Sequence, residues 1–156
     1  GTELWFVGGR PEDIRRIEST VASQDLARVR FFGHRTVREL PTFLFAADVL
    51  VLASTSKGTA IDGTNHVDYS SPMKLFEYFA AGRPIVSTAL AGVKEVASDG
   101  ENALLVPLDD PAELARGITQ VLTDDALARK LSDRARETAL RHTWRRRADE
   151  LLARIR

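Results

Sequence analysis

The amino-acid sequence predicts an α/β protein built as a Rossmann-like, doubly wound parallel sheet with helices on both faces. Two observations support this prediction. Short apolar runs alternate with helix-length segments along the 156-residue chain, an order typical of parallel sheets. One run, VLVLA at residues 49–53, has no polar interruption, as expected for a strand covered on both faces.

The first half of the chain contains three expected strands, at residues 3–9, 29–33 and 48–54. Pro11 is suited to the first turn of a helix, which we expect to extend to about Ser23. A shorter helix is expected at residues 36–47. Residues 55–70, rich in Gly, Thr, Asp and Asn, form the only long loop, and a loop of this length inside a compact domain is usually functional.

The second half continues the alternation. We expect a helix from Ser71 to Ala81, and then a strand, a short helical piece and a strand at residues 84–88, 92–98 and 102–107. Helices fill the remainder, beginning where Asp110 is a capping residue and Pro111 stands in the first turn. No repeat or linker divides the sequence, so residues 1–156 are interpreted as one domain.

Composition excludes several classes of protein. With 44% hydrophobic and 28% charged residues, the chain fits an ordered soluble domain. Its 22 basic residues balance 22 acidic ones, so net charge gives no argument for nucleic-acid binding. The apolar run 43–53 is interrupted by Asp48 and is shorter than the ~20 residues that span a bilayer. With neither a signal pattern nor cysteine, we expect a cytoplasmic protein.

The start of the helix at residues 71–81 has the chemistry of an anion site. Ser71 is a good N-cap and Pro72 a good first helical residue. The backbone amides of Met73 and Lys74 would then point out of the helix start, where such amides bind phosphate. The helix dipole and the Lys74 ammonium would strengthen this attraction. Ligands of open parallel sheets bind at this edge, beyond the carboxyl ends of the strands.

Glu77 lies one turn beyond these amides, on the same side of the helix as Met73 and Lys74. A carboxylate in this position can accept hydrogen bonds from ribose hydroxyls. The alternative is a surface ion pair with Lys74, three residues earlier, which would contribute little. Spacing alone favours neither interpretation.

Other nucleotide and metal motifs are missing from the sequence. The residues after the first strand, GGRPED, lack the G-x-G-x-x-G spacing of dinucleotide dehydrogenases, and SKGT has the wrong order for a phosphate-binding Walker sequence. The three histidines, His34, His66 and His142, show no metal-ligand spacing. We therefore expect no metal site.

Four segments resemble, in order, the carboxyl-terminal half of GT-B glycosyltransferases of family 4: residues 47–54, 71–88, 95–124 and 143–155. The most specific piece is KLFEYFAAGRPIV, residues 74–86. The resemblance implies that residues 1–156 are the nucleotide-sugar-binding C-terminal domain of a two-domain enzyme. The first strand-helix unit of that domain and the N-terminal acceptor domain would lie outside this chain. The missing strand would be central, and its neighbours would pair directly or receive a strand from another copy.

The resemblance also implies roles for particular residues. Glu77 would hold the ribose hydroxyls, and the amides of Met73 and Lys74 would approach the diphosphate. Gly33, His34 and Arg35 match the segment that accepts the base, and for His34 the backbone is the better candidate because an exposed loop histidine is common.

The sugar-binding part of the motif departs from the family pattern. Tyr69 stands eight residues before Glu77, where the family usually has another glutamate. Asp68 is a candidate substitute for that glutamate's contact with the sugar.

The implied function is transfer of a hexose from a nucleoside diphosphate sugar, of UDP or GDP type, to an acceptor hydroxyl with retention, without a metal or other cofactor. This chain alone is expected to be inactive, and no catalytic residue is assigned in it. Cell-envelope or polysaccharide biosynthesis is the expected setting. Alternatives are a sugar-nucleotide epimerase of GT-B fold and a non-catalytic nucleotide-binding or interaction domain.

The expected partners are the nucleotide sugar, the enzyme's own N-terminal domain and a membrane-associated acceptor. In the family the closing helix packs against the other half, so the stripe formed by Trp144, Ala148, Leu151 and Ile155 is expected to be exposed here. Peripheral attachment at the inner face of the membrane is compatible with this stripe.

Overall fold

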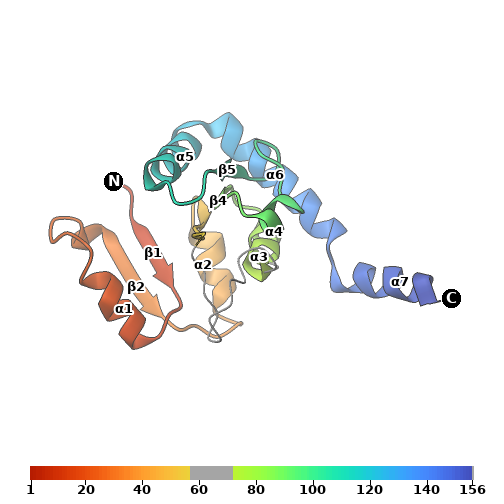
Figure 1. Ribbon diagram of the computed structural model, residues 1–156, viewed down its shortest axis with the longest axis horizontal. Helices are drawn as coiled ribbons and strands as arrows, with labels where there is room; N and C mark the ends of the chain where they lie inside the picture. Colours follow the sequence, from red (N-terminus) through yellow and green to blue (C-terminus); the bar gives the residue numbers. More distant parts are fainter. Residues whose placement is uncertain (57–71, 156) are drawn as a thin grey trace. The chain divides into compact units, whose positions relative to one another are not determined.

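The computed structural model describes residues 1–56 and 72–155 (Figure 1). The chain divides into two compact units, Gly1–Phe43 and Leu44–Arg156. The first unit contains β1 (Leu4–Val7), α1 (Pro11–Glu18), a 3-10 helix (Leu26–Arg28) and β2 (Val29–Gly33). Helix α2 (Leu40–Ala46) begins in the first unit and ends in the second.

Strands β1 and β2 are parallel, with Leu4 opposite Val29 and Phe6 opposite Phe31. Aromatic rings pack on both sides of this ladder. The Phe6 and Phe31 rings stack with their centroids 5.1 Å apart. A second group contains the rings of Trp5, Phe32 and Phe43. In it, the Trp5 and Phe32 centroids are 5.2 Å apart and the Phe32 and Phe43 centroids are 4.9 Å apart. Alternation of side chains along each strand separates the two groups of rings.

The second unit is a three-stranded parallel sheet. Its strands are β3 (Leu50–Leu52), β4 (Ile85–Thr88) and β5 (Leu104–Val106), in the order β3-β4-β5. All four residues of the central strand β4 are buried. The remaining helices are α3 (Met73–Ala81), α4 (Ala91–Lys94), α5 (Pro111–Thr123), α6 (Asp125–Arg141) and α7 (Trp144–Ile155).

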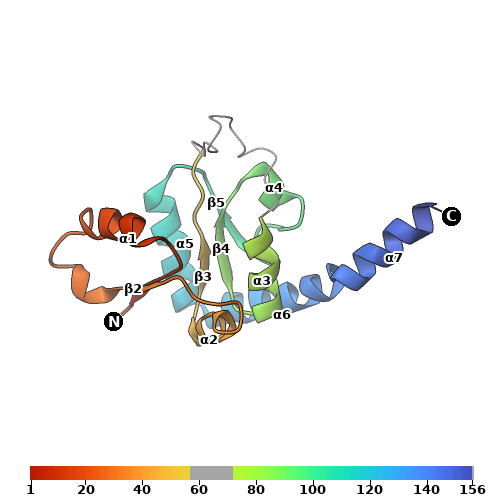
Figure 2. The same cartoon turned by 90° about the horizontal axis from the view of Figure 1, so that it is seen from below.

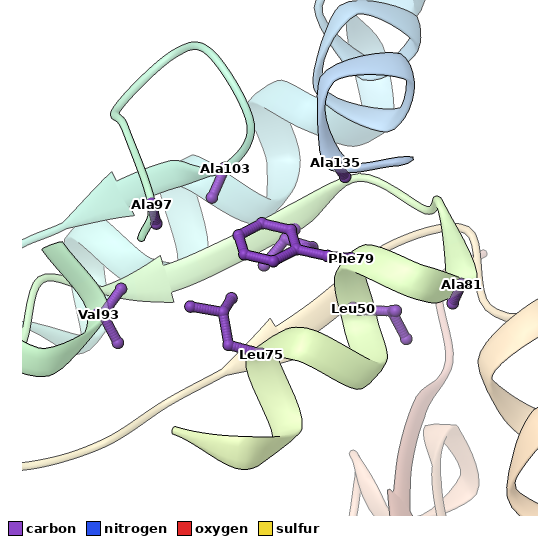
Figure 3. Close-up of a cluster of buried hydrophobic side chains, with 9 residues drawn as sticks. Leu50, Leu75, Phe79, Ala81, Val93, Ala97, Ala103 and Ala135 are labelled. Atoms are coloured by element: carbon purple, nitrogen blue, oxygen red, sulfur yellow. The ribbon is translucent and has the colours of Figure 1, made fainter. Parts of the chain in front are cut away.

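Helices cover both faces of this sheet, with α3 and α5 on opposite sides (Figure 2). On one face, Leu75 and Phe79 of α3 pack with Ile85, Val93 of α4 and Ala135 of α6 (Figure 3). On the other face, a second core contains residues from β4, β5, α5 and α6: Val86, Val106, Val121 and Leu131. The neighbouring residues Ile85 and Val86 point to opposite faces, as strand geometry requires. The predicted α/β fold class is confirmed.

Some element boundaries differ from the sequence-based expectations. Helix α1 stops at Glu18 because the Ser19 and Thr20 hydroxyls donate to the carbonyls of Arg16 and Ile17, a local hydrogen bond that competes with helix continuation. Helix α2 begins at Leu40, later than expected.

Helix α3 begins at Met73, and the prediction that Pro72 is its first helical residue is wrong. Pro72 precedes the helix with φ −76° and ψ 83°, and this ψ lies outside the helical range. Ser71, expected as the N-cap, lies outside the described residues.

The parallel strands form two sheets, whereas the sequence predicted one. In the described ranges the main-chain ladders are β1-β2 and β3-β4-β5. Strands β1 and β3 would flank the missing central strand. These ladders do not include a direct pairing between them.

Gly82 ends α3 in the left-handed conformation, with φ 61°, and a Cβ there would overlap the Arg136 side chain, whose Cδ lies 2.8 Å from that position. Gly100 has a similar φ of 68° but open space around it. We predict that Gly100→Ala lowers the free energy of unfolding by about 1 kcal/mol through backbone strain. Gly82→Ala should cost more than Gly100→Ala, because the Arg136 side chain must also move. Urea unfolding of both variants measures the difference, and equal losses would contradict the close approach.

Candidate functional site

Helix α3 has one buried face and one exposed face. Leu75 and Phe79 have no exposed surface, whereas Met73 is 57% exposed and the side chains of Lys74 and Glu77 are also exposed. At 3.6 residues per turn, residues 73, 74 and 77 share the side opposite to the core-facing residues. The packing of α3 therefore presents the three predicted ligand-binding residues to solvent.

The start of α3 lies at the carboxyl edge of the three-stranded sheet. This follows from topology, because β3 and β4 are parallel and α3 connects the end of one to the beginning of the other. The Leu75 amide donates to the Pro72 carbonyl over 2.9 Å, and the amides of Met73 and Lys74 precede that bond. Amides in the first helical turn have no partner within the helix. Both can therefore donate to an anion at this edge.

No ion pair joins Lys74 to Glu77 in the part of the chain that the structure describes. The alternative interpretation of Glu77, a surface ion pair with Lys74, is therefore not supported by the structure. Burial of the neighbouring Tyr78 phenol, with a smaller contribution from the Glu77 carboxylate, raises the pKa of Tyr78. The Glu77 carboxylate remains at the surface, in reach of a ligand.

The residues predicted to accept a base follow β2. Gly33 has a left-handed φ of 65°, His34 is exposed, and Arg35 is half-buried. The Arg35 guanidinium lies 5.8 Å from the centre of the Phe43 ring and its Nη1 is 3.8 Å from Glu39 Oε1. These residues belong to the first unit and Glu77 to the second.

The sequence did not predict a polar cluster that lies at the carboxyl edge of the sheet in the second unit. Ser54, Ser56, Thr88 and Asp109 are joined there by hydrogen bonds. A short-range signal could not have found it, because Ser56 and Asp109 are 53 residues apart. Tyr69 and Asp68, the candidates for the sugar contact, lie outside the described residues.

Two further findings concern metal ions and membranes. Within residues 1–56 and 72–155, no three His, Cys, Asp or Glu side chains are grouped so that they could hold a metal ion. Over the same residues, no helix is long and apolar enough to cross a membrane.

The fold is that of the C-terminal domain of GT-B enzymes. The structure of Anabaena Alr3699/HepE, solved in complex with UDP, matches with a TM-score of 0.78 and 19% identity, covering 99% of this chain and 40% of that one. The solved C-terminal domain of LpcC, a group 1 family glycosyl transferase from Francisella tularensis, matches with a TM-score of 0.56 and 16% identity, covering 87% of this chain and 82% of that one.

Sequence comparison defines the family. The model of the family "Glycosyl transferases group 1" matches residues 1–124, and the chain therefore belongs to this family. The lipopolysaccharide core biosynthesis glycosyltransferase LpsE of Rhizobium meliloti is 31% identical over 142 residues, which are 88% of this chain and 36% of LpsE. The chain thus spans about a third of the length of this relative.

The turn after the predicted base-binding segment supplies a test of local geometry. Hydrogen bonds from the hydroxyl and then the amide of Thr36 lower the pKa of Glu39 below its ordinary 4.5. The ionised Glu39 carboxylate, held by these hydrogen bonds, stabilises the turn above pH 4.5. This contribution is lost as the pH falls through the lowered pKa of Glu39. We predict that Thr36→Ala raises the pKa of Glu39, as followed by NMR titration of the carboxyl carbon. Thr42→Ala, the control, should leave it unchanged, and an unchanged value in Thr36→Ala would contradict this geometry.

Proposed function

We propose that this chain is the donor-binding C-terminal domain of a two-domain glycosyltransferase, which transfers a hexose from a nucleoside diphosphate sugar to an acceptor hydroxyl with retention. One observation carries the proposal. The start of α3 places two donating amides at the carboxyl edge of a parallel sheet, with Lys74 beside them and Glu77 exposed one turn further on. This arrangement combines a diphosphate site with a carboxylate for ribose hydroxyls.

Each part of the donor has a proposed partner. The diphosphate binds the amides of Met73 and Lys74 at the helix start after Pro72, and the Lys74 ammonium adds a positive charge. The ribose binds Glu77, whose side chain is exposed.

The base binds the backbone of Gly33 and His34, beside Arg35. Arg35 has a buried Nε without a hydrogen-bond partner in the described chain. The sugar contact involves Tyr69 or Asp68. Ser71, which precedes Pro72 in the sequence, belongs to the diphosphate end of the proposed site.

The chemistry follows from charge. As the glycosidic bond breaks, negative charge grows on the leaving diphosphate, and preorganised amides and cations stabilise that charge in the transition state. A UDP-type donor is favoured over a GDP-type donor because HepE, a protein of the same fold, was solved with UDP. The name of LpsE places that relative in lipopolysaccharide core biosynthesis, which supports an envelope or polysaccharide acceptor. The proposed location, the cytoplasm or the inner face of the membrane, stays a prediction.

The proposal predicts that one nucleoside diphosphate binds and that Glu77→Ala weakens its binding about tenfold or more, which is about 1.4 kcal/mol. Calorimetric titration with UDP, GDP and ADP measures the dissociation constants in the full-length polypeptide. Glu95→Ala is the matched control, because Glu95 is an exposed glutamate at the end of α4.

If the wild type and Glu77→Ala bind the diphosphate with equal affinity, Glu77 does not hold the ribose. Absence of binding of all three diphosphates by the folded full-length polypeptide would overturn the proposed function itself. Binding without transfer to any acceptor would favour the non-catalytic alternative.

We also propose that α7 packs against the N-terminal domain of the complete enzyme. Every described residue of α7 is exposed, including Trp144 at 75%, Leu151 at 53% and Ile155 at 81%, as the sequence predicted. An apolar stripe of this kind usually marks an interface. The fragment would then lack the surface that covers it.

We predict that the double substitution Leu151→Glu with Ile155→Glu lowers the thermal midpoint of the full-length polypeptide by several degrees, and leaves that of the 156-residue chain unchanged. Differential scanning calorimetry of both lengths checks this. Arg147→Glu, on the same exposed helix, is the control. An equal effect at both lengths, or none in the full-length polypeptide, would contradict the proposed packing.

A further inference from the structure

The segment that follows β3 is held across the carboxyl edge of the sheet by two side chains, one at the end of β4 and one in the turn after β5. The Ser54 amide donates to Thr88 Oγ1, at the end of β4, over 2.9 Å. The Ser56 amide donates to Asp109 Oδ1, after β5, over 3.1 Å, and the Ser56 hydroxyl donates to Asp109 Oδ2. Because the strand order is β3-β4-β5, residues 54–56 pass over the end of β4 toward β5.

Asp109 adopts a left-handed backbone conformation that residues other than glycine rarely occupy. Its φ is 57°, the only positive φ among the described non-glycine residues. Such a conformation costs free energy, persists only where the surrounding structure enforces it, and tends to occur at functional sites. Here it accompanies a carboxylate that accepts two hydrogen bonds from Ser56. The carboxylate supplies a contact that glycine, the residue best suited to this backbone, could not make.

We propose that Asp109 is a positioning residue for the nucleotide-sugar donor. This inference rests on the proposed function and adds to it a residue that acts through Ser56. Residues 54–56 and the start of α3 lie at the same edge of the same sheet, where the donor is proposed to bind. By fixing Ser56, Asp109 holds the backbone and hydroxyls of residues 54–56 over β4 before the donor arrives.

The physical effect is preorganisation. A segment that is already ordered loses little conformational entropy when a ligand binds against it, whereas a loose segment must be ordered at the expense of affinity. The Thr88 hydroxyl secures the near end of the segment and Asp109 the far end. Removing the Asp109 carboxylate should therefore free Ser56 while Ser54 stays in place.

The first test needs no ligand. Amide hydrogen exchange of the full-length polypeptide, followed residue by residue, should show faster exchange at Ser56 in Asp109→Gly and unchanged exchange at Ser54. Glycine accepts a φ of 57° without strain, so the thermal midpoint should stay within about 2 °C of the wild type. Unchanged exchange at Ser56 would overturn the proposed contact.

The second test measures donor affinity. Titration of UDP, GDP and ADP should show that Asp109→Gly binds the preferred diphosphate about fivefold more weakly. Asp109→Asn keeps an acceptor oxygen and tolerates this backbone, so it should recover most of the affinity. Ser56→Ala retains the amide and should show an intermediate loss.

The outcomes separate the two proposals. If the wild type binds a diphosphate and Asp109→Gly binds it equally well, the positioning role is overturned and the proposed function stands. If affinity and thermal midpoint fall together in Asp109→Gly and Asp109→Asn alike, the residue is structural and the positioning role is again overturned. If the wild type binds none of the three diphosphates, the proposed function fails first and the inference fails with it.

Discussion

The packing of α3 against α6 and one face of the three-stranded sheet is the interaction on which the proposed site depends. Leu75 and Phe79 have no exposed surface, and burying one such side chain contributes about 2–3 kcal/mol. Rotating α3 to bring Glu77 inward would expose these side chains and bury a carboxylate, and both changes are costly. Gly82 allows the chain to turn directly into β4 beneath Arg136. The core thus fixes which residues of α3 face a ligand.

The parallel sheet determines where the proposed ligand would lie. Three strands end at one edge, and the connections after them bring together residues that are distant in the sequence. Helix α3 starts at this edge with amides that have no acceptor within the helix, and Asp109 and Thr88 hold residues 54–56 there. The hydroxyl and carboxylate contacts satisfy main-chain groups of a segment that has left the ladder of β3. Side-chain hydrogen bonds therefore hold residues 54–56 at the edge, whereas main-chain hydrogen bonds hold the strands together within the sheet.

Elements with strong local signals could be predicted from the sequence. Asp110 caps α5 as expected, its carboxylate accepting from the Glu113 amide over 3.0 Å, because a cap depends on residues three positions apart. The apolar runs located the five strands of the described residues, because the alternation that marks a strand is also local. The bond between Ser56 and Asp109 depends on topology, which periodicity does not reveal. The ligand-binding role of α3 stays a prediction. The start of the helix was predicted too early because Pro72 fits both the first turn of a helix and the residue before it.

The most direct test of the account is a crystal structure of the full-length polypeptide with the diphosphate it binds. We expect the diphosphate oxygens to accept hydrogen bonds from the amides of Met73 and Lys74, and a ribose hydroxyl to lie about 2.6–3.0 Å from a Glu77 carboxylate oxygen. A nucleotide bound away from the start of α3, with Glu77 facing solvent, would contradict the account.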